Sequence, residues 1–316
     1  MNEAIINEKK VSKISLGTVQ LGLNYGIANN EGQPSLEKSF QILKKAINGG
    51  INALDTARGY GNSEDVLGEY FRKNANDKLF ITTKYKCSLG EDATYNEIEK
   101  DVFTSVETSL NKLGVDKIDC LLLHNAFYKG VYQGKNISKA FEKLTVKGLV
   151  GITGLSMARY IEEIEDMFSF DVFKATQVPM NIFDLRLIKS GLYEKMIAKN
   201  IHIFVRSVFF QGLFFLDANK IQNQQLKELV YDYLIALQDI ARKEKMSMAE
   251  LAISFIRDIK GVTSLVLGAD NQDQVEENIK YLNSPSISEN GRREIETKLS
   301  GVDILAIMQE LAKPKQ

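Results

Sequence analysis

The sequence predicts a single (β/α)₈ barrel that spans residues 1–316. Short β-branched segments alternate eight times with longer amphipathic segments. No linker-like or low-complexity stretch interrupts the series. Eight strand–helix units fit a closed barrel with helices outside the strands better than an open sheet. Strict alternation is also compatible with a doubly wound open sheet, so that fold remains the alternative.

The elements follow one another in a regular order. Each expected strand is a run of six to nine residues rich in β-branched and other apolar side chains, and each expected helix has apolar residues at helical spacing. The first helix, for example, ends at the glycine pair 49–50, which is a helix stop. The expected strands are 13–20, 51–56, 79–85, 118–125, 149–156, 173–181, 201–208 and 261–269. The expected helices are 36–50, 63–73, 95–114, 137–148, 158–168, 188–200, those within 225–259, and 271–282. An insert at about 209–224 and a helical tail at about 285–316 would be additions to the barrel.

Composition is compatible with an ordinary enzyme and gives no positive indication of a nucleic-acid or membrane partner. The chain has 40 Lys and Arg against 41 Asp and Glu, so its net charge of −1 gives no global basic field. Two cysteines and two histidines are too few for a disulfide framework or a typical zinc site, and we expect no metal. No apolar run approaches the roughly 18–20 residues that span a bilayer, and the polar start MNEAIINEKK is unlike a secretory signal. We expect a cytoplasmic location, and the sequence leaves the oligomeric state open.

Reactive side chains gather where three successive strands end. Asp55 ends the second strand and Tyr60 follows it, Lys84 ends the third strand, and His124 ends the fourth. In a (β/α)₈ barrel, catalytic groups lie at this C-terminal face. Alone, each has a structural interpretation: a helix cap for Asp55, a packed ring for Tyr60, a solvated terminus for Lys84 and a core histidine for His124. Their joint placement predicts a catalytic site.

The segments LDTARGYGNSEDVLG, ITTKYK and LLLHN resemble the signature segments of the aldo-keto reductases. The later segments ATQVPMNIFD and LVLGADNQDQVEEN are similar to that family as well, so the resemblance covers about residues 13–283. It implies a barrel that binds a nicotinamide cofactor without a Rossmann domain, and no G-x-G-x-x-G opens a helix here. The segment RSVFFQGLFF resembles a bacterial subgroup associated with sugar metabolism, which is an analogy and not a mechanism.

The resemblance implies a role for each of the four reactive residues. Tyr60 would donate a proton to the alkoxide that hydride transfer leaves on a carbonyl carbon. Because a tyrosine is a weak acid near neutral pH, the Lys84 cation would stabilise the phenolate. Asp55 would hold Lys84 in place, and His124 would donate a hydrogen bond to the substrate oxygen.

The turn around Tyr60 carries further groups. We predict that Ser63 caps the following helix, with Glu64 and Asp65 as structural acids in its first turn. The glycines on either side of Tyr60 give the backbone the freedom to point the ring into the site. Arg58 is left open between a salt bridge and a substrate contact.

The resemblance also implies the cofactor contacts. Ser156 and Gln177 would hold the nicotinamide carboxamide, and Arg206 stands where the family commonly has a stacking tyrosine. The other implied contacts are Ser207, Gln211, Gly212, Leu213, Gly268, Asn271, Gln274, Glu277 and Asn278. NADPH is the expected cofactor, but residues 268–278 contain no cation, and Gln274 takes the place of an arginine. We therefore expect NADH or NAD⁺ to be used at comparable efficiency.

The substrate is expected to be a carbonyl compound, for example a sugar or sugar-derived aldehyde or ketone. Candidate contacts are Tyr25, Arg58, Asn125 and Phe127, whose aromatic and polar character suits a sugar. Two alternatives remain open. One is a redox-sensing regulatory protein with slow turnover, similar to the potassium-channel β-subunits of the family. The other is a lyase or isomerase that works through a Schiff base on Lys84.

Overall fold

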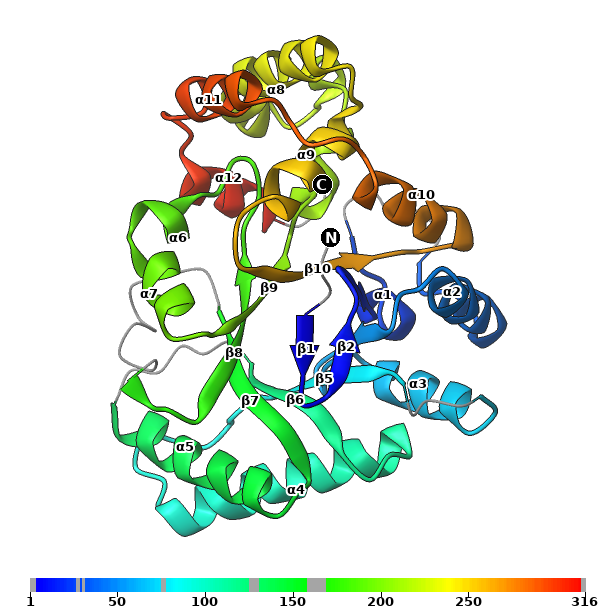
Figure 1. The fold of residues 1–316 in the computed structure, drawn as a ribbon, viewed down its shortest axis with the longest axis vertical. Coiled ribbons are helices and arrows are strands. Elements are labelled where there is room, and N and C mark those ends of the chain that lie inside the picture. Colours follow the sequence, from blue (N-terminus) through cyan, green and yellow to red (C-terminus); the bar gives the residue numbers. More distant parts are fainter. Residues whose placement is uncertain are drawn as a thin grey trace.

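The computed structural model describes residues 4–26, 29, 32–74, 78–124, 131–157 and 169–313. Eight parallel strands form a closed barrel with helices around it (Figure 1). In barrel order they are β3 (Ile14–Gly17), β4 (Ala53–Asp55), β5 (Phe80–Tyr85), β6 (Ile118–Leu123), β7 (Val150–Ser156), β8 (Phe173–Pro179), β9 (His202–Arg206) and β10 (Val262–Gly268). Because β10 pairs with β3, the ring has no open edge. The predicted (β/α)₈ barrel is confirmed, and the open-sheet alternative is wrong.

The helices follow the strands in the predicted order. They are α1 (Val19–Gly22), α2 (Leu36–Asn48), α3 (Ser63–Phe71), α4 (Tyr95–Leu113), α5 (Val131–Val146), α6 (Arg186–Lys189), α7 (Leu192–Ala198), α8 (Gln224–Glu244), α9 (Met248–Arg257), α10 (Gln272–Leu282), α11 (Glu289–Lys298) and α12 (Ile304–Leu311). The single helix expected at 188–200 is wrong, because Gly191 adopts a φ of 75° and separates α6 from α7. The helix expected at 158–168 lies outside the described residues.

Two clusters of buried apolar side chains make up the core. The larger one joins the outer faces of the strands to the helices. The smaller one fills the inside of the barrel and contains Ile6, Val11, Ala53, Phe80, Cys120, Leu122, Ile152, Ala175 and Phe204. Successive residues of a strand point to opposite faces, so every second side chain of each strand faces the interior.

A hairpin that the sequence analysis missed closes the N-terminal end of the barrel. Strands β1 (Ala4–Ile6) and β2 (Lys9–Val11) pair antiparallel, and the positive φ angles of Asn7 and Glu8 form a tight two-residue turn. Lys9 Nζ donates to the carbonyl of Leu79, just before β5, at 2.9 Å. Lys9 also pairs with Asp119 at the start of β6, at 2.8 Å. Together these contacts hold the apolar side of the hairpin against the barrel interior.

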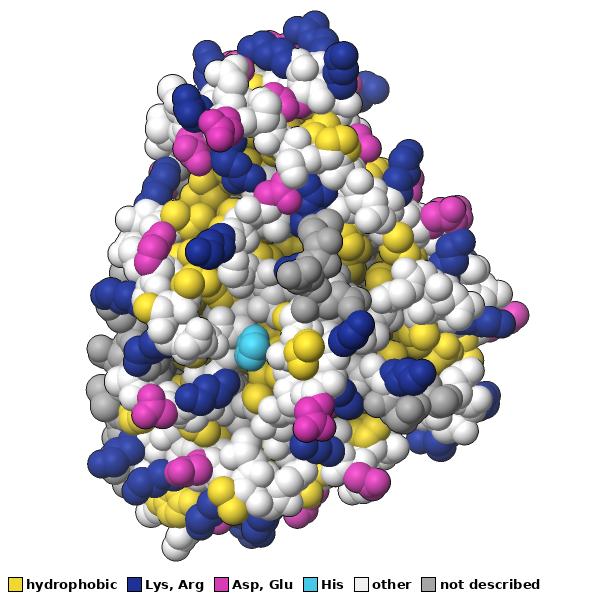
Figure 2. Space-filling model, in the orientation of Figure 1, with side chains coloured by type: hydrophobic (Ala, Val, Ile, Leu, Met, Phe, Trp, Pro, Cys, Tyr) yellow, Lys and Arg dark blue, Asp and Glu magenta, His cyan; other side chains and the backbone are white. Residues whose placement is uncertain are grey.

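Of the two helices of the tail, α11 lies beside α8 at the top of Figure 1, and α12 is drawn below it. Between β9 and α8, the expected insert contains two short 3₁₀ turns, η2 (Phe210–Phe215) and η3 (Ala218–Lys220). Helices α11 and α12 of the tail both pack on α8. On the face shown in Figure 2, basic and acidic side chains are interspersed. None of the helices in the described ranges combines the length and apolar character that a membrane crossing requires.

Candidate active site

The inward-facing side chains change character along the strands. They are apolar near the hairpin, for example Ala53 in β4 and Phe80 in β5. Two positions beyond Ala53 comes Asp55, and four positions beyond Phe80 comes Lys84. The alternation of a strand keeps each pair on the same face. Strand pairing therefore brings the polar groups together at the C-terminal end of the barrel.

Asp55 and Lys84 form a buried ion pair. Lys84 Nζ lies 2.9 Å from Asp55 Oδ1 and 2.8 Å from Oδ2, and their side chains are 0% and 4% exposed. The ammonium also donates to the Thr56 carbonyl at 2.9 Å and to the Tyr60 hydroxyl at 3.2 Å. Burial lowers the pKa of Lys84, but Asp55 and Tyr60 raise it more, so the net pKa lies above its ordinary value. The lysine is therefore a charged group that touches Tyr60.

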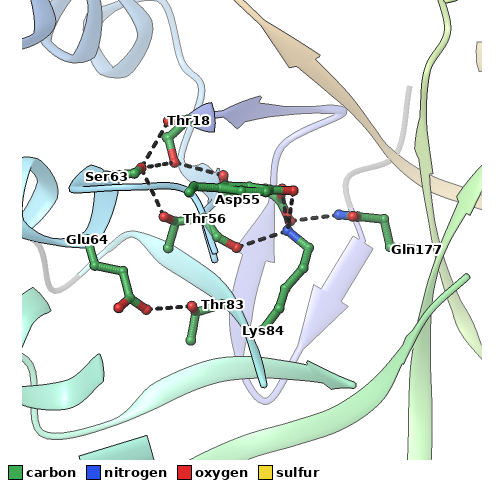
Figure 3. A network of polar contacts seen from close by, with 9 residues as sticks. Thr18, Asp55, Thr56, Ser63, Glu64, Thr83, Lys84 and Gln177 are labelled. Carbon is green, nitrogen blue, oxygen red and sulfur yellow. Dashed lines mark hydrogen bonds and ion pairs between the residues drawn. The ribbon is translucent and has the colours of Figure 1, made fainter. Parts of the chain in front are cut away.

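Gln177 reaches Asp55 from the other side of the barrel. Its Nε2 donates to Asp55 Oδ1 at 2.6 Å, so Lys84 and Gln177 converge on one carboxylate (Figure 3). The sequence predicted only a cofactor contact for Gln177. Because the carboxylate is held from two directions, it fixes the position of the Lys84 ammonium.

Tyr60 and His124 lie next to each other above this ion pair. Their rings meet edge to face, with centroids 5.9 Å apart and an interplanar angle of 88°. Lys84 Nζ is 4.7 Å from the centroid of the Tyr60 ring. Burial, and then the charges of Lys84, Arg206 and Lys86, lower the pKa of His124 to about 4. His124 is therefore neutral at physiological pH, so one ring nitrogen carries a hydrogen and acts as a donor.

The turn that carries Tyr60 is fixed by close backbone contacts and a hydroxyl network. Gly61 has a φ of 56°, and a Cβ there would lie 2.1 Å from the Gly22 carbonyl oxygen. Ser63 Oγ contacts Thr18 Oγ1 at 2.7 Å and Thr56 Oγ1 at 3.0 Å (Figure 3). The predicted cap role of Ser63 is wrong, because Asn62 occupies the N-cap and Ser63 lies in the first turn of α3.

Glu64 has a structural contact, as expected. Its Oε1 accepts a hydrogen bond from Thr83 Oγ1 at 2.7 Å, which ties α3 to β5 beside Lys84. Arg58 Nη1 lies 3.8 Å from Glu64 Oε2. Arg58 does not line the cavity formed by the described residues. The geometry thus favours the ion-pair interpretation of Arg58 over a substrate contact.

A cavity of about 560 Å³ opens above the ion pair. Its lining includes Tyr60, His124 and Tyr25. Most of the predicted cofactor contacts line the same cavity: Ser156, Gln177, Arg206, Ser207, Gln211, Gly212, Gly268, Gln274, Glu277 and Asn278. Leu213 is instead fully buried in the core, and Asn271 is also absent from the lining. The predicted substrate contacts Asn125 and Phe127 lie outside the described residues.

One wall of the cavity is the loop after β9, which has an unusual backbone. Ser207, Gln211 and Gly212 have φ angles of 62°, 57° and 96°. Positive φ is costly for residues other than glycine and is found at ligand-binding sites more often than elsewhere. This wall lines the cavity with a mixture of polar and apolar residues, among them Ser207, Gln211 and Phe209.

Another wall is the start of α10. Asn271 caps this helix, because its Oδ1 accepts from the Gln274 backbone N–H at 2.9 Å. Gln274 Oε1 in turn accepts from the Asp270 N–H at 2.8 Å. Asn278 Nδ2 donates to the Gly268 carbonyl at 3.2 Å. The cap uses only the Oδ1 of Asn271, so the cofactor contact implied for this residue stays a prediction.

Several cavity residues were missed by the sequence analysis. Val19 and Gln20 come two and three residues after the end of β3, so the rule that placed Asp55 and His124 at strand ends also applies to them. Phe215 and Tyr281 come from η2 and α10, and no local pattern marks them as lining residues.

The comparisons with known proteins agree with this architecture. A model of the aldo/keto reductase family matches residues 13–299. The chain belongs to the aldo/keto reductase family. It is 26% identical over 307 residues to the L-glyceraldehyde 3-phosphate reductase of Escherichia coli K12, covering 88% of this chain and 87% of that protein. It is also 26% identical over 302 residues to the NADH-specific methylglyoxal reductase of the same strain, covering 86% and 90%. The holo form of an aldo-keto reductase from Bacillus halodurans superposes with a TM-score of 0.76 at 20% identity, covering 94% and 96% of the two chains. Membership of this oxidoreductase family agrees with the closed barrel.

Proposed function

We propose that this aldo/keto reductase uses NADPH or NADH to interconvert the carbonyl and alcohol forms of a small, polyhydroxylated or sugar-derived compound. One observation carries the proposal: the buried Lys84 ammonium contacts the Asp55 carboxylate and the Tyr60 hydroxyl at once. This is the arrangement that a tyrosine needs in order to act as a proton donor and acceptor near neutral pH.

In the reduction direction, bound NAD(P)H supplies the hydride that forms the new C–H bond at the carbonyl carbon. Tyr60 gives its hydroxyl proton to the carbonyl oxygen, which completes the O–H bond of the alcohol. Lys84 balances the charge left on the phenolate, and Asp55 and Gln177 keep the ammonium in place. Neutral His124 donates a hydrogen bond to the same oxygen and orients the substrate. Alcohol oxidation uses these groups in reverse.

The cofactor would occupy the cavity between the β9 loop and α10. Ser156 and Gln177 would face the nicotinamide carboxamide, and Ser207, Gln211 and Gly212 offer polar groups for the phosphates. At the α10 end, Asp270 and Glu277 line the cavity, and no cation from 268–278 is present to hold a 2′-phosphate. We therefore infer that NADPH is preferred only narrowly over NADH.

The cavity and the named relatives support a small polar substrate. Tyr25, Phe209 and Phe215 give the lining aromatic surface, and Gln20 adds a polar side chain. The relatives reduce L-glyceraldehyde 3-phosphate and methylglyoxal by name, and both are short carbonyl compounds. A short sugar-like aldehyde or ketone fits the same description.

Substrate-dependent oxidation of NADPH and of NADH, across a panel of sugar, polyol and simple aldehydes, tests this function. We expect turnover on the order of 1 s⁻¹ or faster, as is typical of enzymes, for at least one polyhydroxylated carbonyl. Ready reduction of hydrophobic aldehydes with indifference to every sugar would contradict the substrate class. Tight cofactor binding with only trace turnover on all carbonyls would instead favour the redox-sensing regulatory role.

The Schiff-base alternative has no support in the geometry. A lysine that attacks a carbonyl needs a lowered pKa so that the amine is free. The pKa of Lys84 is raised, and its ammonium is held by Asp55, Thr56 and Tyr60.

A further inference from the structure

Arg206 is the only lysine or arginine among the described residues that line the cavity. It ends β9 and is half-buried. Its Nη2 donates to the Met157 carbonyl at 2.7 Å and its Nη1 donates to Ser207 Oγ at 3.1 Å. Both acceptors are neutral, and within the described ranges no carboxylate forms an ion pair with it. A partly desolvated guanidinium that lacks a counter-charge is costly, and a ligand anion would offset that cost.

The side chain of Arg206 points toward the catalytic end of the cavity. Strand β9 lies between β8 and β10, and Met157 directly follows β7. The guanidinium therefore reaches across β8 toward β7, away from β10 and the start of α10. After burial and Lys84, Arg206 is the next cause that lowers the pKa of His124, so the two groups interact electrostatically.

The charges that line the other end of the cavity have the opposite sign. Asp270 and Glu277 lie there, at the end of β10 and in α10. An anionic group on a ligand is therefore repelled at the α10 end and attracted at the Arg206 end. The guanidinium also keeps N–H groups beyond the two that bind Met157 and Ser207, in a fork that suits carboxylate or phosphate oxygens.

We propose that Arg206 binds an oxyanion, a carboxylate or a phosphate, carried by the substrate. The preferred substrates would then be anionic aldehydes and ketones, such as sugar phosphates or sugar acids, rather than neutral sugars. This inference rests on the proposed function, since it assigns the substrate class of the same site. Lysine would replace Arg206 only in part, because it offers a point charge in place of a planar fork.

The first test measures binding and needs no turnover. Glycerol 3-phosphate and glycerol are titrated against the full-length protein saturated with NADP⁺, by calorimetry. We expect glycerol 3-phosphate to bind about 10–100-fold more tightly than glycerol, as for a charge-assisted bidentate contact. In Arg206→Gln this preference should shrink to about threefold or less, and Arg206→Lys should fall between the two. Thermal melts of both variants establish that they are folded.

The second test uses kinetics with substrates that share a reacting group. We compare kcat/KM for glyceraldehyde 3-phosphate with glyceraldehyde, and for succinic semialdehyde with butyraldehyde. The ratio of kcat/KM for the anionic substrate to kcat/KM for the neutral one should fall about 10–100-fold in Arg206→Gln. Lys86→Gln is the matched control, because Lys86 also acts on the pKa of His124 but is exposed and does not line the cavity. It should change the ratio by about twofold or less.

Three results would overturn the inference. The first is a wild-type protein that shows no preference for anionic ligands, and the second is a preference that survives in Arg206→Gln. The third is a loss of NADP⁺ affinity in Arg206→Gln with an unchanged substrate ratio, which would assign the guanidinium to the cofactor phosphates. Failure of the wild type to bind either dinucleotide contradicts the proposed function itself and is thereby distinguished from all three.

Discussion

The two ends of the barrel interior are built by the same strands but have opposite chemistry. Near the hairpin, Phe80 and Phe204 stack with ring centroids 6.2 Å apart, and Ile6 and Val11 cover them. At the other end, β5 carries Lys84 only four residues after Phe80, a distance of about 13 Å along an extended strand. One end is closed and apolar, whereas the other is polar and opens into the cavity.

The apolar end of the barrel contributes mainly to stability, and the polar end contributes mainly to the chemistry. The apolar end contributes the favourable burial that holds the ring closed. The polar end buries an ion pair, which costs desolvation and is a weak source of stability. The apolar side chains near the hairpin also keep water out of that end of the barrel. The contact between Lys84 and Tyr60 therefore lies in a low-dielectric environment. Substitutions at the polar end should therefore lower mainly the activity, and substitutions at the apolar end should lower mainly the free energy of unfolding.

The largest expected effect is at the polar end. Tyr60→Phe should lower kcat for carbonyl reduction by about 10²–10⁴-fold, because no other described group contacts Lys84 with a transferable proton. NADPH binding, followed by fluorescence, should be nearly unchanged. Tyr85→Phe is the control: that ring packs outside the barrel and its hydroxyl bonds to Asp101 at 2.6 Å. Near-normal turnover of Tyr60→Phe would show that the proton comes from elsewhere.

Lys84→Met should damage both activity and stability. It removes the cation that supports Tyr60, and it leaves Asp55 buried without its partner, which should cost about 3–5 kcal/mol of the free energy of unfolding. Adding Asp55→Asn to it should restore much of that stability, measured by urea denaturation, without restoring turnover. A double variant that regained activity would show that the ion pair serves the fold alone.

Phe80→Ala tests the apolar end. Removing this ring from the interior cluster should lower the free energy of unfolding by about 3–5 kcal/mol. Below its unfolding midpoint the variant should keep the KM and kcat of the wild type within about threefold, since Lys84 and Asp55 keep their contacts. Loss of activity without loss of stability would mean that the two ends are not separable.

The pH dependence of stability should report the buried state of His124. In the folded protein its pKa is about 4, whereas in the unfolded chain it is the ordinary 6.5. Between these values the unfolded state binds more protons, so stability is lost as the pH falls from 6.5 toward 4, by about 1–3 kcal/mol. His124→Gln should flatten that part of the curve. Parallel curves for the wild type and this variant would contradict the shifted pKa.

The smallest effect is expected at the α10 end. Gln274→Arg should strengthen NADPH binding by about tenfold through a new contact to the 2′-phosphate, and leave NADH binding nearly unchanged. The dissociation constants of both dinucleotides measure this. Strong NADPH selectivity in the wild type would mean that a cation from another loop already binds that phosphate.

Local sequence patterns favour the barrel over an open sheet and predict where Asp55 and Lys84 lie on their strands. Strand positions follow from short apolar runs, and alternation along each run puts Asp55 and Lys84 on the inner face. These are local properties, which the backbone geometry of a strand converts into a fixed direction for each side chain. The other predicted lining residues, for example Ser156 and Arg206, came from the family resemblance and not from a local pattern. Gly17, Val19, Gln20, Val266 and Leu267 lie at or just after strand ends and were missed.

Which of these groups touch one another depends on the tertiary structure. Gln177 donates to Asp55 across 122 residues of sequence, Ser63 bonds to Thr18 instead of capping its helix, and Arg206 reaches Met157 two strands away. The closure of the barrel end by the β1–β2 hairpin likewise depends on the tertiary structure. Such contacts depend on the tilt and register of the closed ring, which position each strand end relative to strands far away in the sequence. No local pattern carries that information, because period and propensity specify the direction of a side chain but not the partner that it meets.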